Sequence, residues 1–482
     1  MREAAKPLRV VLLQPPAKGA IKSLLPQIDE DGDGIGFKPP LGILYVASTL
    51  KAKSPHEVLV IDAMAEHLDF NELLQKVLAF QPDVVGVSAW TDFWYPAWRI
   101  GQMIKDAIPT VHLSYGGPHV GIYPQETLDV SFTGSVIVGD GEVPFLYLCN
   151  MLSHGRIDNS LPGLHLAGLG VKPQPDTFYI QNDLDELPIP DRRLLPIEKY
   201  GSVLSKGEFV TTMITSRGCP HKCTFCKLNF QKTLCISAES VVDEFRQIQD
   251  LGIREVEIYD DTFTWGKQRL RDICEGLIAA DIKVEWAVRD RVSSADPELL
   301  KLMYRAGCRR IHFGIESGVQ SVIDTMKKRI TLEQARNAIK YARAAKMTVL
   351  TYWMFGNPGE TQRDMEGTVA FARELDADYA EFSITIPYAG TEMYSQALAN
   401  GTISYDYWHD FACNPVADFE VPELIEMHAD LATLKRIQKS AVRQYYFRPK
   451  YLLRELTSLD NFAQFLRKAK MGARLFNSVY VK

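Results

Sequence analysis

The sequence of 482 residues lacks the features that mark several large classes of protein. No stretch approaches about 18 uninterrupted apolar residues, so we expect no transmembrane helix. The first nine residues lead directly into the apolar run Val10–Leu13 and contain neither the long apolar core nor the small-residue cleavage site of a signal peptide. Eight cysteines are too few for a disulfide scaffold. These absences predict a cytoplasmic protein with reduced thiols.

Phosphate-binding signatures and repeats are also missing. Neither G-x-G-x-x-G after the first apolar run nor G-x4-G-K-[ST] occurs, which argues against a nucleotide as the ligand of the N-terminal part. We find no internal repeat and no low-complexity tract. Hydrophobic residues make up 46% of the chain and charged residues 24%. This composition is ordinary for a globular protein and excludes a disordered chain, a collagen and a coiled coil. The length predicts two to four domains.

Charge is unevenly distributed along the chain. The formal net charge is −6, but from Lys435 to the end there are 12 Lys and Arg against 2 Asp and Glu. A basic tail on an acidic body indicates an anionic partner, and docking on that acidic body or exposure of a solvated helical face are the alternatives. We hypothesise that the tail helps to enclose the active site; contact with an anionic substrate or an acidic membrane surface is compatible with the same composition. The residues concerned are Tyr445, Tyr446, Phe447, Arg448, Lys450, Arg467, Lys468 and Lys470.

Residues 1–150 alternate short apolar runs with helical patterns. This rhythm predicts an α/β domain, a doubly wound parallel sheet with helices on both faces, whose ligand lies beyond the carboxyl ends of the strands. The strands are predicted at Val10–Leu13, Glu57–Ile61, Val84–Ser88, Val111–Ser114 and Ser135–Val138. The helices are predicted at Ile43–Lys51, Phe70–Phe80 and Ala97–Ala107.

A second series of strands and helices begins at Phe209. Residues 151–208, which are rich in proline, form a predicted linker with a small hairpin. Six βα units over residues 209–400 predict a partial (β/α)6 barrel, and residues 401–482 a helical, basic C-terminal region. The barrel strands are predicted at Phe209–Thr215, Glu255–Tyr259, Lys283–Val288, Arg310–Ile315, Thr348–Phe355 and Ala380–Thr385.

Three of the eight cysteines lie close together directly after the first barrel strand. Cys219, Cys223 and Cys226 have the spacing C-x3-C-x2-C. Three thiolates suit a 4Fe-4S cluster and leave one iron open for a further ligand. Zinc is the competing interpretation, although His221 is poorly spaced as its fourth ligand. A third interpretation is that the cysteines are chemically inert, because a free cysteine is often simply buried. The other cysteines are expected to behave as small apolar residues.

This cysteine pattern, with Phe225 before the last cysteine, resembles the radical S-adenosylmethionine (SAM) superfamily. In that family SAM chelates the open iron, and an electron delivered to it yields a 5′-deoxyadenosyl radical. The resemblance implies an external electron donor such as flavodoxin or ferredoxin. Strand-end motifs resembling the family follow in order, including Gly314–Gly318 and Gly356–Thr361. The SAM-binding residues it implies are Phe225, Asp260, Asp261, Arg289, Glu316, Ser317 and Gly356.

The N-terminal domain resembles the cobalamin-binding subgroup of these enzymes. The implied cobalamin-binding residues are Pro40, Leu41, Gly42, Ser88, Trp90, Thr91, Gly116, Gly117, Gly141 and Glu142. The cobalt-ligating motif D-x-H-x-x-G of methionine-synthase-like domains is missing. We therefore expect cobalamin without a histidine ligand to cobalt, and a structural role for His119. A degenerate domain without cofactor is the alternative.

The resemblance implies a radical SAM enzyme of biosynthesis, a C-methyltransferase. It would move a methyl group from methylcobalamin to an unactivated carbon, or to phosphorus, of a small anionic or hydrophobic molecule. A non-methylating cyclisation, rearrangement or oxidation, as in magnesium-protoporphyrin cyclase-like enzymes, is the first alternative. A cluster-bearing redox sensor or scaffold is the second. No nucleic-acid partner is expected. Tyr352, Tyr388 and His312 are candidate acid–base or radical partners, with simple packing as the competing interpretation.

Overall fold

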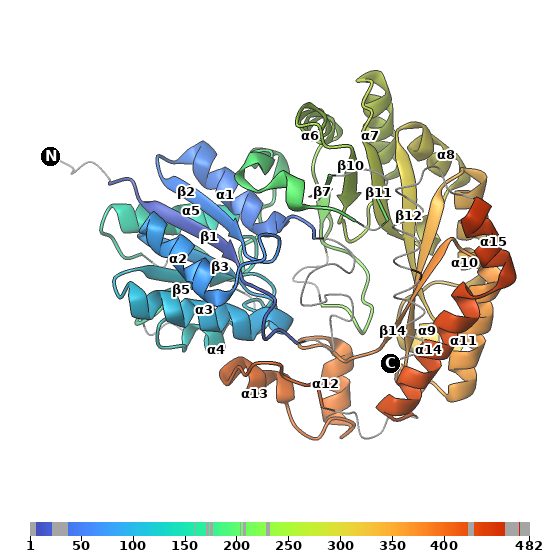
Figure 1. Cartoon of the computed structure of the whole chain (residues 1–482). Helices are drawn as coiled ribbons and strands as arrows, with labels where there is room; N and C mark the ends of the chain where they lie inside the picture. Colours follow the sequence, from blue (N-terminus) through green and yellow to red (C-terminus); the bar gives the residue numbers. More distant parts are fainter. Residues whose placement is uncertain are drawn as a thin grey trace. The chain divides into compact units, whose positions relative to one another are not determined.

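The computed structural model describes residues 6–21, 37–158, 160–169, 173, 177–202, 204–205, 209–227, 232–422, 429–457 and 472. By its internal contacts the chain divides into two units. The first comprises Met1–Thr212, Leu234–Ile236 and Asp406–Pro422, and the second comprises Met213–Thr233, Ser237–Tyr405 and Glu423–Lys482. Each unit is built around its own parallel sheet (Figure 1). The predicted fold class, two α/β domains in succession, is confirmed.

The first unit contains a six-stranded sheet in the order β2-β1-β3-β4-β5-β6. All neighbouring strands are parallel except β5 and β6, which are antiparallel. Because β1 has β2 on one side and β3 on the other, the strand order reverses at β1, and ligands of such sheets bind at this reversal. The strands are β1 (Arg9–Gln14), β2 (Glu57–Asp62), β3 (Val84–Ser88), β4 (His112–Gly116), β5 (Ser135–Ile137) and β6 (Leu164–Leu166).

Two pairs of helices cover this sheet. Helix α1 packs against α5, and α2 packs against α3 (Figure 1). The central strands are continuous apolar runs because both of their faces are buried, as in Val84–Val87. Helix α2 begins at Asp69, whose side chain and Glu72 form a reciprocal capping box. The helices are α1 (Leu41–Lys53), α2 (Phe70–Phe80), α3 (Trp94–Ala107), α4 (Pro124–Leu128) and α5 (Glu142–Ser153).

The predicted linker 151–208 is folded onto the first unit. Strand β6 extends the sheet, and three 3₁₀ helices follow it, η3 (Leu184–Glu186), η4 (Arg192–Leu194) and η5 (Ile197–Lys199). The Tyr200 hydroxyl donates a hydrogen bond of 2.9 Å to the buried carboxylate of Asp62 at the end of β2. The segment is therefore part of a folded unit, with polar anchors that its proline-rich sequence did not indicate.

Part of the C-terminal region also belongs to the first unit. Helix α13 (Tyr407–Cys413) packs against α4, and the indole N–H of Trp94 donates to the Ala412 carbonyl at 2.9 Å. The sequence predicted one C-terminal region, 401–482. In the structure, residues 406–422 of that region belong to the first unit, and the rest belongs to the second. The apolar residues Tyr407, Trp408 and Phe411, all buried, explain this separation.

The strands of the second sheet follow one another in chain order, β7-β10-β11-β12-β13-β14, and all of them except the first three residues of β7 lie in the second unit. This sequential order is that of a partial barrel, as predicted. The strands are β7 (Val210–Met213), β10 (Glu255–Ile258), β11 (Glu285–Arg291), β12 (Cys308–Glu316), β13 (Thr348–Phe355) and β14 (Tyr379–Ile384). A separate two-stranded sheet, β8 (Ser216–Arg217) and β9 (Leu234–Cys235), flanks the cysteine loop. The helices are α6 (Ala238–Asp250), α7 (Lys267–Ala279), α8 (Pro297–Arg305), α9 (Gln320–Thr325), α10 (Leu332–Ala344), α11 (Gln362–Leu375) and α12 (Glu392–Ala399).

Helix α14 (Leu431–Tyr446) lies beside β14, the edge strand of the second sheet (Figure 1). The Tyr446 hydroxyl donates to the Ala380 carbonyl at 2.7 Å and accepts from the Ala380 N–H at 2.9 Å. The Gln438 amide donates to the Phe382 carbonyl at 2.7 Å. The helix therefore supplies hydrogen bonds that an edge strand otherwise leaves to water or to another chain.

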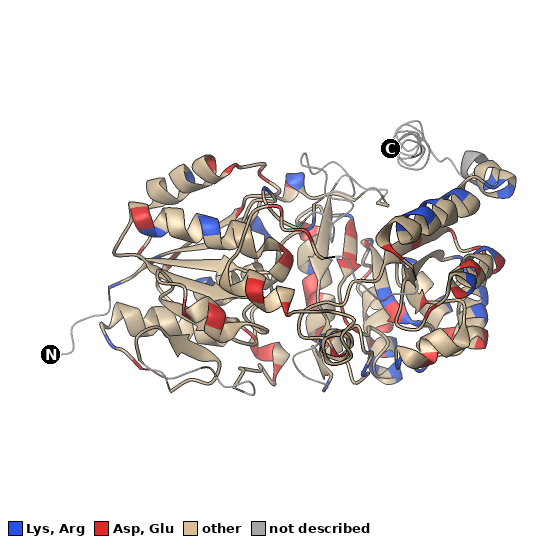
Figure 2. Ribbon diagram, turned by 90° about the horizontal axis from the view of Figure 1, so that it is seen from below, with Lys and Arg blue, Asp and Glu red and all other residues tan. Residues whose placement is uncertain are grey.

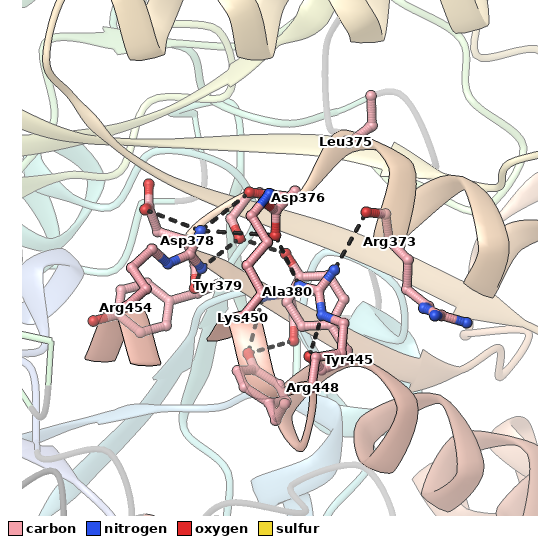
Figure 3. A network of polar contacts seen from close by, with 12 residues as sticks. Arg373, Leu375, Asp376, Asp378, Tyr379, Ala380, Tyr445, Arg448, Lys450 and Arg454 are labelled. Atoms are coloured by element: carbon pink, nitrogen blue, oxygen red, sulfur yellow. Dashed lines mark hydrogen bonds and ion pairs between the residues drawn. The ribbon is translucent and has the colours of Figure 1, made fainter. Parts of the chain in front are cut away.

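The basic residues after α14 dock onto an acidic turn between α11 and β14 (Figure 3). Arg448 and Lys450 pair with Asp376 at 2.9 and 2.7 Å, and Arg454, on α15 (Pro449–Thr457), lies 3.7 Å from it. Figure 2 marks several Lys and Arg positions in blue along the described helices that lead towards the C-terminus. The sequence left three interpretations of the basic tail: an anionic partner, docking on the acidic body, or a solvated helical face. These three basic residues dock on the acidic body.

The hypothesis that the tail encloses the active site is wrong for the described part of the tail. Asp376 precedes β14, so the tail docks at the amino end of that strand, whereas active sites of such barrels form at the carboxyl ends. Tyr445 and Tyr446 contact Ala377 and Ala380 at the same end. Arg467, Lys468 and Lys470 lie outside the described residues.

No helix in the described ranges combines the length and the apolar character that crossing a membrane requires.

Candidate functional site

The cysteine loop follows β7 and lies at the carboxyl end of that strand. Cys219 is buried, Cys223 is partly exposed and Cys226 is exposed, so the loop presents its thiols from the interior outwards. The Cys226 N–H donates to the Cys223 carbonyl at 3.1 Å, which closes a tight turn between these two ligands. Among the described residues, no group of three or more His, Cys, Asp or Glu side chains converges on a single ion position. Three thiolates are the donor set of a cubane cluster with one open iron, whereas zinc in a closed site needs a fourth ligand.

Two aspartates after β10 hold this loop in place. The Asp260 carboxylate, 3% exposed, accepts hydrogen bonds from the Thr215 N–H at 2.6 Å and from the Ser216 hydroxyl at 2.8 Å. The Asp261 carboxylate accepts from the Gly218 N–H at 3.0 Å. Burial raises the pKa of both carboxyls, and these hydrogen bonds oppose the rise. The side chains expected to contact SAM therefore fix the backbone on the N-terminal side of Cys219.

Arg291 contacts the cysteine loop directly, although the sequence analysis did not single it out. Its Nη1 donates to the Cys223 sulfur at 3.6 Å, and its Nη2 donates to the Lys328 carbonyl. The Thr224 N–H donates to the Met326 carbonyl at 3.0 Å, so the loop and the turn after α9 are joined twice. Arg291 is 8% exposed and has a buried Nε without a partner among the described residues. A buried guanidinium therefore faces the position where the cluster would be held.

A buried ion pair lies next to Phe225. The Lys328 ammonium is 2.6 Å from the Glu316 carboxylate and 5.6 Å from the centre of the Phe225 ring. Glu316 adopts φ +72°, a left-handed conformation that a non-glycine residue rarely takes, where the pairing of β12 with β13 shifts register. Such strained residues persist only where the surroundings hold them, and they cluster at functional sites. Lys328 was missed because it stands in a turn that matches no motif.

The remaining predicted SAM residues divide between backbone and packing positions. Ser317 is fully buried, and its hydroxyl is 3.1 Å from the Thr368 hydroxyl, so it fixes the turn after β12. Gly356 has φ +81°, which only glycine adopts easily, and it begins the turn after β13. In that turn the buried Glu360 accepts from the Asn357 N–H at 2.9 Å, and burial raises its pKa to about 7.

The recorded contacts of Arg289 are with Tyr259 and Glu257 on the neighbouring strand region and not with the described cysteine loop. Its guanidinium stacks on the Tyr259 ring at 3.9 Å, and its Nη2 is 3.8 Å from the Glu257 carboxylate. Two of the acid–base candidates lie near it. The His312 Nδ1 is 2.8 Å from the Tyr352 hydroxyl, and the Arg289 cation lowers the pKa of that hydroxyl. The third, Tyr388, is in the turn after β14, where its carbonyl accepts from the Thr391 hydroxyl. The structure thus groups Arg289 with Tyr352 and His312.

In the first unit, the predicted cobalamin residues stand at strand ends and helix starts. Ser88 ends β3 and Trp90 follows it, Gly116 ends β4, and Pro40 and Gly141 precede α1 and α5. Trp90 is 50% exposed, and a side chain added at Gly42 would meet nothing within 4 Å. The carboxyl edge of this sheet therefore offers an aromatic side chain and unobstructed glycine backbone. In contrast, the side chains of Leu41, Thr91 and Glu142 are buried.

Gly117 and His119 serve the structure of the first unit. Gly117 has φ +102°, and a Cβ there would lie 2.8 Å from the Ala89 carbonyl oxygen, so the loops after β3 and β4 approach too closely for a side chain. His119 is fully buried, stacks on Trp94 at 4.3 Å and has its Nδ1 3.2 Å from the Thr91 hydroxyl. Burial lowers the pKa of His119 to about 3, so the ring is neutral.

Two family models match the chain. The radical SAM superfamily model covers residues 213–372, and the B12 binding domain model covers residues 36–148. An uncharacterized methyltransferase of Pyrococcus horikoshii is 32% identical over 464 residues, 95% of this chain and 96% of that protein. Cytidylyl-2-hydroxyethylphosphonate methyltransferase of Streptomyces wedmorensis is 28% identical, over 76% of this chain and 78% of that protein. The anaerobic magnesium-protoporphyrin IX monomethyl ester cyclase of Rubrivivax gelatinosus is 28% identical, over 77% and 68%.

Solved structures share the fold. The radical SAM methyltransferase TsrM from Kitasatospora setae, with cobalamin and a [4Fe-4S] cluster bound, has a TM-score of 0.67 and 20% identity, and the match covers 82% of this chain and 79% of that one. The cobalamin-dependent radical SAM enzyme OxsB, with aqua-cobalamin and SAM bound, has a TM-score of 0.68 and 17% identity, over 99% and 72%.

Proposed function

Because the chain belongs to the cobalamin-binding branch of the radical SAM superfamily, we propose that it transfers a methyl group to an unactivated carbon, or to phosphorus, of a small molecule. It is a radical SAM enzyme of the methyltransferase type, and its cofactors are a [4Fe-4S] cluster, SAM and cobalamin. Bound together, these groups supply a carbon-centred radical and a methyl donor. The observation that carries the proposal is the three-cysteine loop at a strand's carboxyl end in a chain that also has the B12 domain.

We assign the cluster to Cys219, Cys223 and Cys226. Asp260 and Asp261 hold the backbone before the first ligand, and Arg291 donates to the sulfur of the second. Arg289 was expected among the SAM-binding residues, but for the SAM carboxylate we propose Arg291. Its buried Nε has no partner among the described side chains, and its Nη1 reaches the ligand loop. A guanidinium suits a carboxylate in fork geometry.

For cobalamin we propose the carboxyl edge of the first sheet, around Gly42, Ser88, Trp90 and Gly116. The open glycine backbone and the exposed indole support contact with a large planar ligand. His119 is unsuited to ligate cobalt, since its ring is enclosed between Trp94 and the Thr91 hydroxyl. We therefore propose that the protein supplies no histidine ligand to the metal from this loop.

The cluster requires reduced thiols and an electron supply. We infer that the protein works in the cytoplasm, where thiols stay reduced, and that a small electron carrier such as flavodoxin or ferredoxin reduces it. The methylating reaction is favoured over a cyclisation or a redox-sensing role because the relative that matches nearly the whole chain is named a methyltransferase.

Methyl-deuterated SAM tests the proposed reaction. The full chain, reconstituted anaerobically with iron, sulfide and cobalamin and reduced chemically, is incubated with a metabolite extract and labelled SAM. Mass spectrometry should find a product that carries three deuterium atoms, together with 5′-deoxyadenosine. A product without the label beside stoichiometric 5′-deoxyadenosine would support the non-methylating alternative, and no 5′-deoxyadenosine at all would support a redox sensor.

A further inference from the structure

The second sheet carries an unusual set of charged side chains on the face that its helices leave uncovered. Side chains of neighbouring residues on a strand point to opposite faces. Val256, Ile258, Ile311, Phe313 and Val349 are fully buried on the face that packs against the helices. The alternate positions form the inner face, which in barrels of this kind is usually filled by branched apolar residues. Here it bears Glu255, Glu257, Arg289, Arg310, His312, Tyr352 and Glu381.

The buried end of this set fixes the hydrogen-bond direction at His312. Arg310 bridges Glu255 and Glu257 at 3.2 and 3.0 Å, and its Nε donates to the His312 Nε2 at 3.0 Å. A guanidinium has no acceptor atom and keeps its protons, so Nε2 must be the unprotonated nitrogen. The ring proton is therefore on Nδ1, from which it is donated to the Tyr352 oxygen at 2.8 Å.

The Tyr352 hydroxyl therefore has a proton to donate, and no acceptor for it is recorded among the described residues. His312 is the donor in their contact, and the nearby Arg289 has no lone pair. Burial raises the pKa of Tyr352 to about 12, although the Arg289 cation lowers it, so the hydroxyl stays protonated. Within the described ranges, no acceptor is recorded for this proton. The side chain is only partly buried, so an external acceptor can reach it.

Glu381 presents the complementary group on the adjacent strand. Tyr352 and Glu381 are register partners of β13 and β14. Burial raises the pKa of Glu381 and the Arg289 cation lowers it, yet no hydrogen bond or ion pair is recorded for this carboxylate among the described residues. Within the described ranges the inner face thus combines a hydroxyl proton with no recorded acceptor and a carboxylate with no recorded hydrogen bond. A carboxylate with no recorded ion pair among the described residues favours a cationic ligand at its own position.

We propose that Tyr352 and Glu381, with Arg289 beside them, bind the methyl acceptor by a primary amine that has a hydroxyl or carbonyl oxygen next to it. The Tyr352 hydroxyl donates to the oxygen, and the Glu381 carboxylate accepts from the ammonium. Arg310 and His312 are positioning residues, because they act only by orienting Tyr352. The assignment rests on the proposed methyltransferase function, narrows its substrate to amino alcohols and amino-acid derivatives, and disfavours the anionic or hydrophobic substrate first expected.

The probe for this site is serinol, an amine between two hydroxyls, compared with glycerol and propionate. Binding to the full-length holoenzyme is followed by saturation-transfer-difference NMR. We expect the order serinol, then glycerol, then propionate. Tyr352→Phe and Glu381→Gln should each weaken serinol at least tenfold, whereas the helix-surface controls Tyr341→Phe and Glu366→Gln should leave its affinity unchanged. Propionate binding as tightly as serinol, or serinol binding unaffected by both inner-face changes, would overturn the proposal.

Two further measurements keep the test independent of variant folding and of turnover. A crystal of the wild-type chain soaked in serinol should show its nitrogen within hydrogen-bond distance of the Glu381 carboxylate; density only at other places contradicts the assignment. Label transfer from deuterated SAM needs no serinol. Serinol binding without any labelled product therefore contradicts the methyltransferase function alone, and a labelled product that lacks an amine contradicts this substrate class alone.

Discussion

Six of the eight cysteine side chains fall into two groups by their surroundings. Cys149, Cys274 and Cys308 are buried in the cores of the two units, and burial raises the pKa of each thiol, so they are inert. Cys219, Cys223 and Cys226 stand in one loop at a strand end. The physical difference is their position: thiols in a loop at a strand end can reach a bound metal cluster, whereas core thiols are enclosed by apolar side chains.

Replacing any one of the loop cysteines by serine should abolish stable cluster formation. Each variant should fall from about 4 irons per chain to well under half of that, because a cubane with one open iron needs all three thiolates. Iron analysis and the visible absorption of the reconstituted protein measure this. Cys413→Ser, at an exposed position outside the loop, is the matched control and should retain wild-type iron. Full iron in Cys226→Ser would contradict the assignment.

Arg291 should raise the reduction potential of the cluster. Its Nη1 donates to the Cys223 sulfur, and hydrogen bonds to cluster sulfurs stabilise the reduced, more negative state. In Arg291→Met the ratio of reduced to oxidised cluster at a fixed potential should drop about tenfold, about 59 mV for one electron. Potentiometric EPR titration measures it. Arg289→Met, two residues earlier on β11, is the control and should leave the potential nearly unchanged; equal shifts in both variants would refute a specific contact.

Sequence patterns could identify the residues that recur in short motifs, but not their partners. The cysteine spacing, Glu316 and Gly356 were visible because each stands in a recognisable stretch. Arg291 and Lys328 were missed, since they reach the site only through β11 pairing with β12 and through the turn after α9. Arg289 was preferred to Arg291 although both project from one face of β11, because a sequence does not show how far along a strand the site lies.

At the level of elements, helix α14 protects the open edge of the second sheet. Tyr446→Phe leaves the buried N–H and carbonyl of Ala380 without their partner, which should cost about 1–3 kcal/mol of unfolding free energy. Urea denaturation measures the loss. Tyr341→Phe, on helix α10, removes a hydroxyl elsewhere and should change stability by less than about 0.5 kcal/mol. A Tyr446→Phe protein as stable as wild type would show that the edge does not depend on this helix.

The buried carboxyl of Asp62 makes the first unit sensitive to pH. Burial raises the pKa of Asp62 from 3.8 to about 6, with the Tyr200 hydroxyl opposing the rise. Above pH 4 the unfolded chain releases this proton while the folded chain keeps it until about pH 6, so folding becomes less favourable as pH rises through this window. Asp62→Asn should lack that loss.

Unfolding by urea at pH 4.5 and pH 7.5 tests this. Relative to wild type, the unfolding free energy of Asp62→Asn should rise by at most about 3 kcal/mol from pH 4.5 to pH 7.5. The limit follows because one pKa unit corresponds to about 1.4 kcal/mol. Asp106→Asn, at an exposed helical position, should follow the wild-type curve. If the gap between Asp62→Asn and wild type did not widen with pH, the Asp62 carboxyl would be ionised in the folded protein at low pH as well.

Strands were the elements that the sequence predicted best. The apolar runs of β3 and β13 are bounded by polar or glycine residues, and their predicted limits match the structure. The linker and the C-terminal region were predicted less well. Their attachments are single polar anchors, such as Tyr200 to Asp62 and Arg448 to Asp376, which join residues more than 70 positions apart and leave no periodic pattern.

At the scale of the whole molecule, two α/β units divide the chemistry between them. The first carries the open sheet edge proposed for cobalamin, and the second carries the cysteine loop and the charged inner face. Their succession in one chain could be predicted, since each has its own rhythm of strands and helices. The charged inner face could not, because alternate residues of five strands become one surface only after the strands have paired.

The measurement that tests the central claim most directly is the joint quantification of the two products of SAM. If one SAM molecule supplies the radical and a second the methyl group, the full holoenzyme turning over its substrate should form 5′-deoxyadenosine and S-adenosylhomocysteine in equal amounts. Cys223→Ser should lose 5′-deoxyadenosine, because the radical needs the cluster. Wild-type protein that forms only one of the two products, or forms 5′-deoxyadenosine without its loop cysteines, would contradict the account.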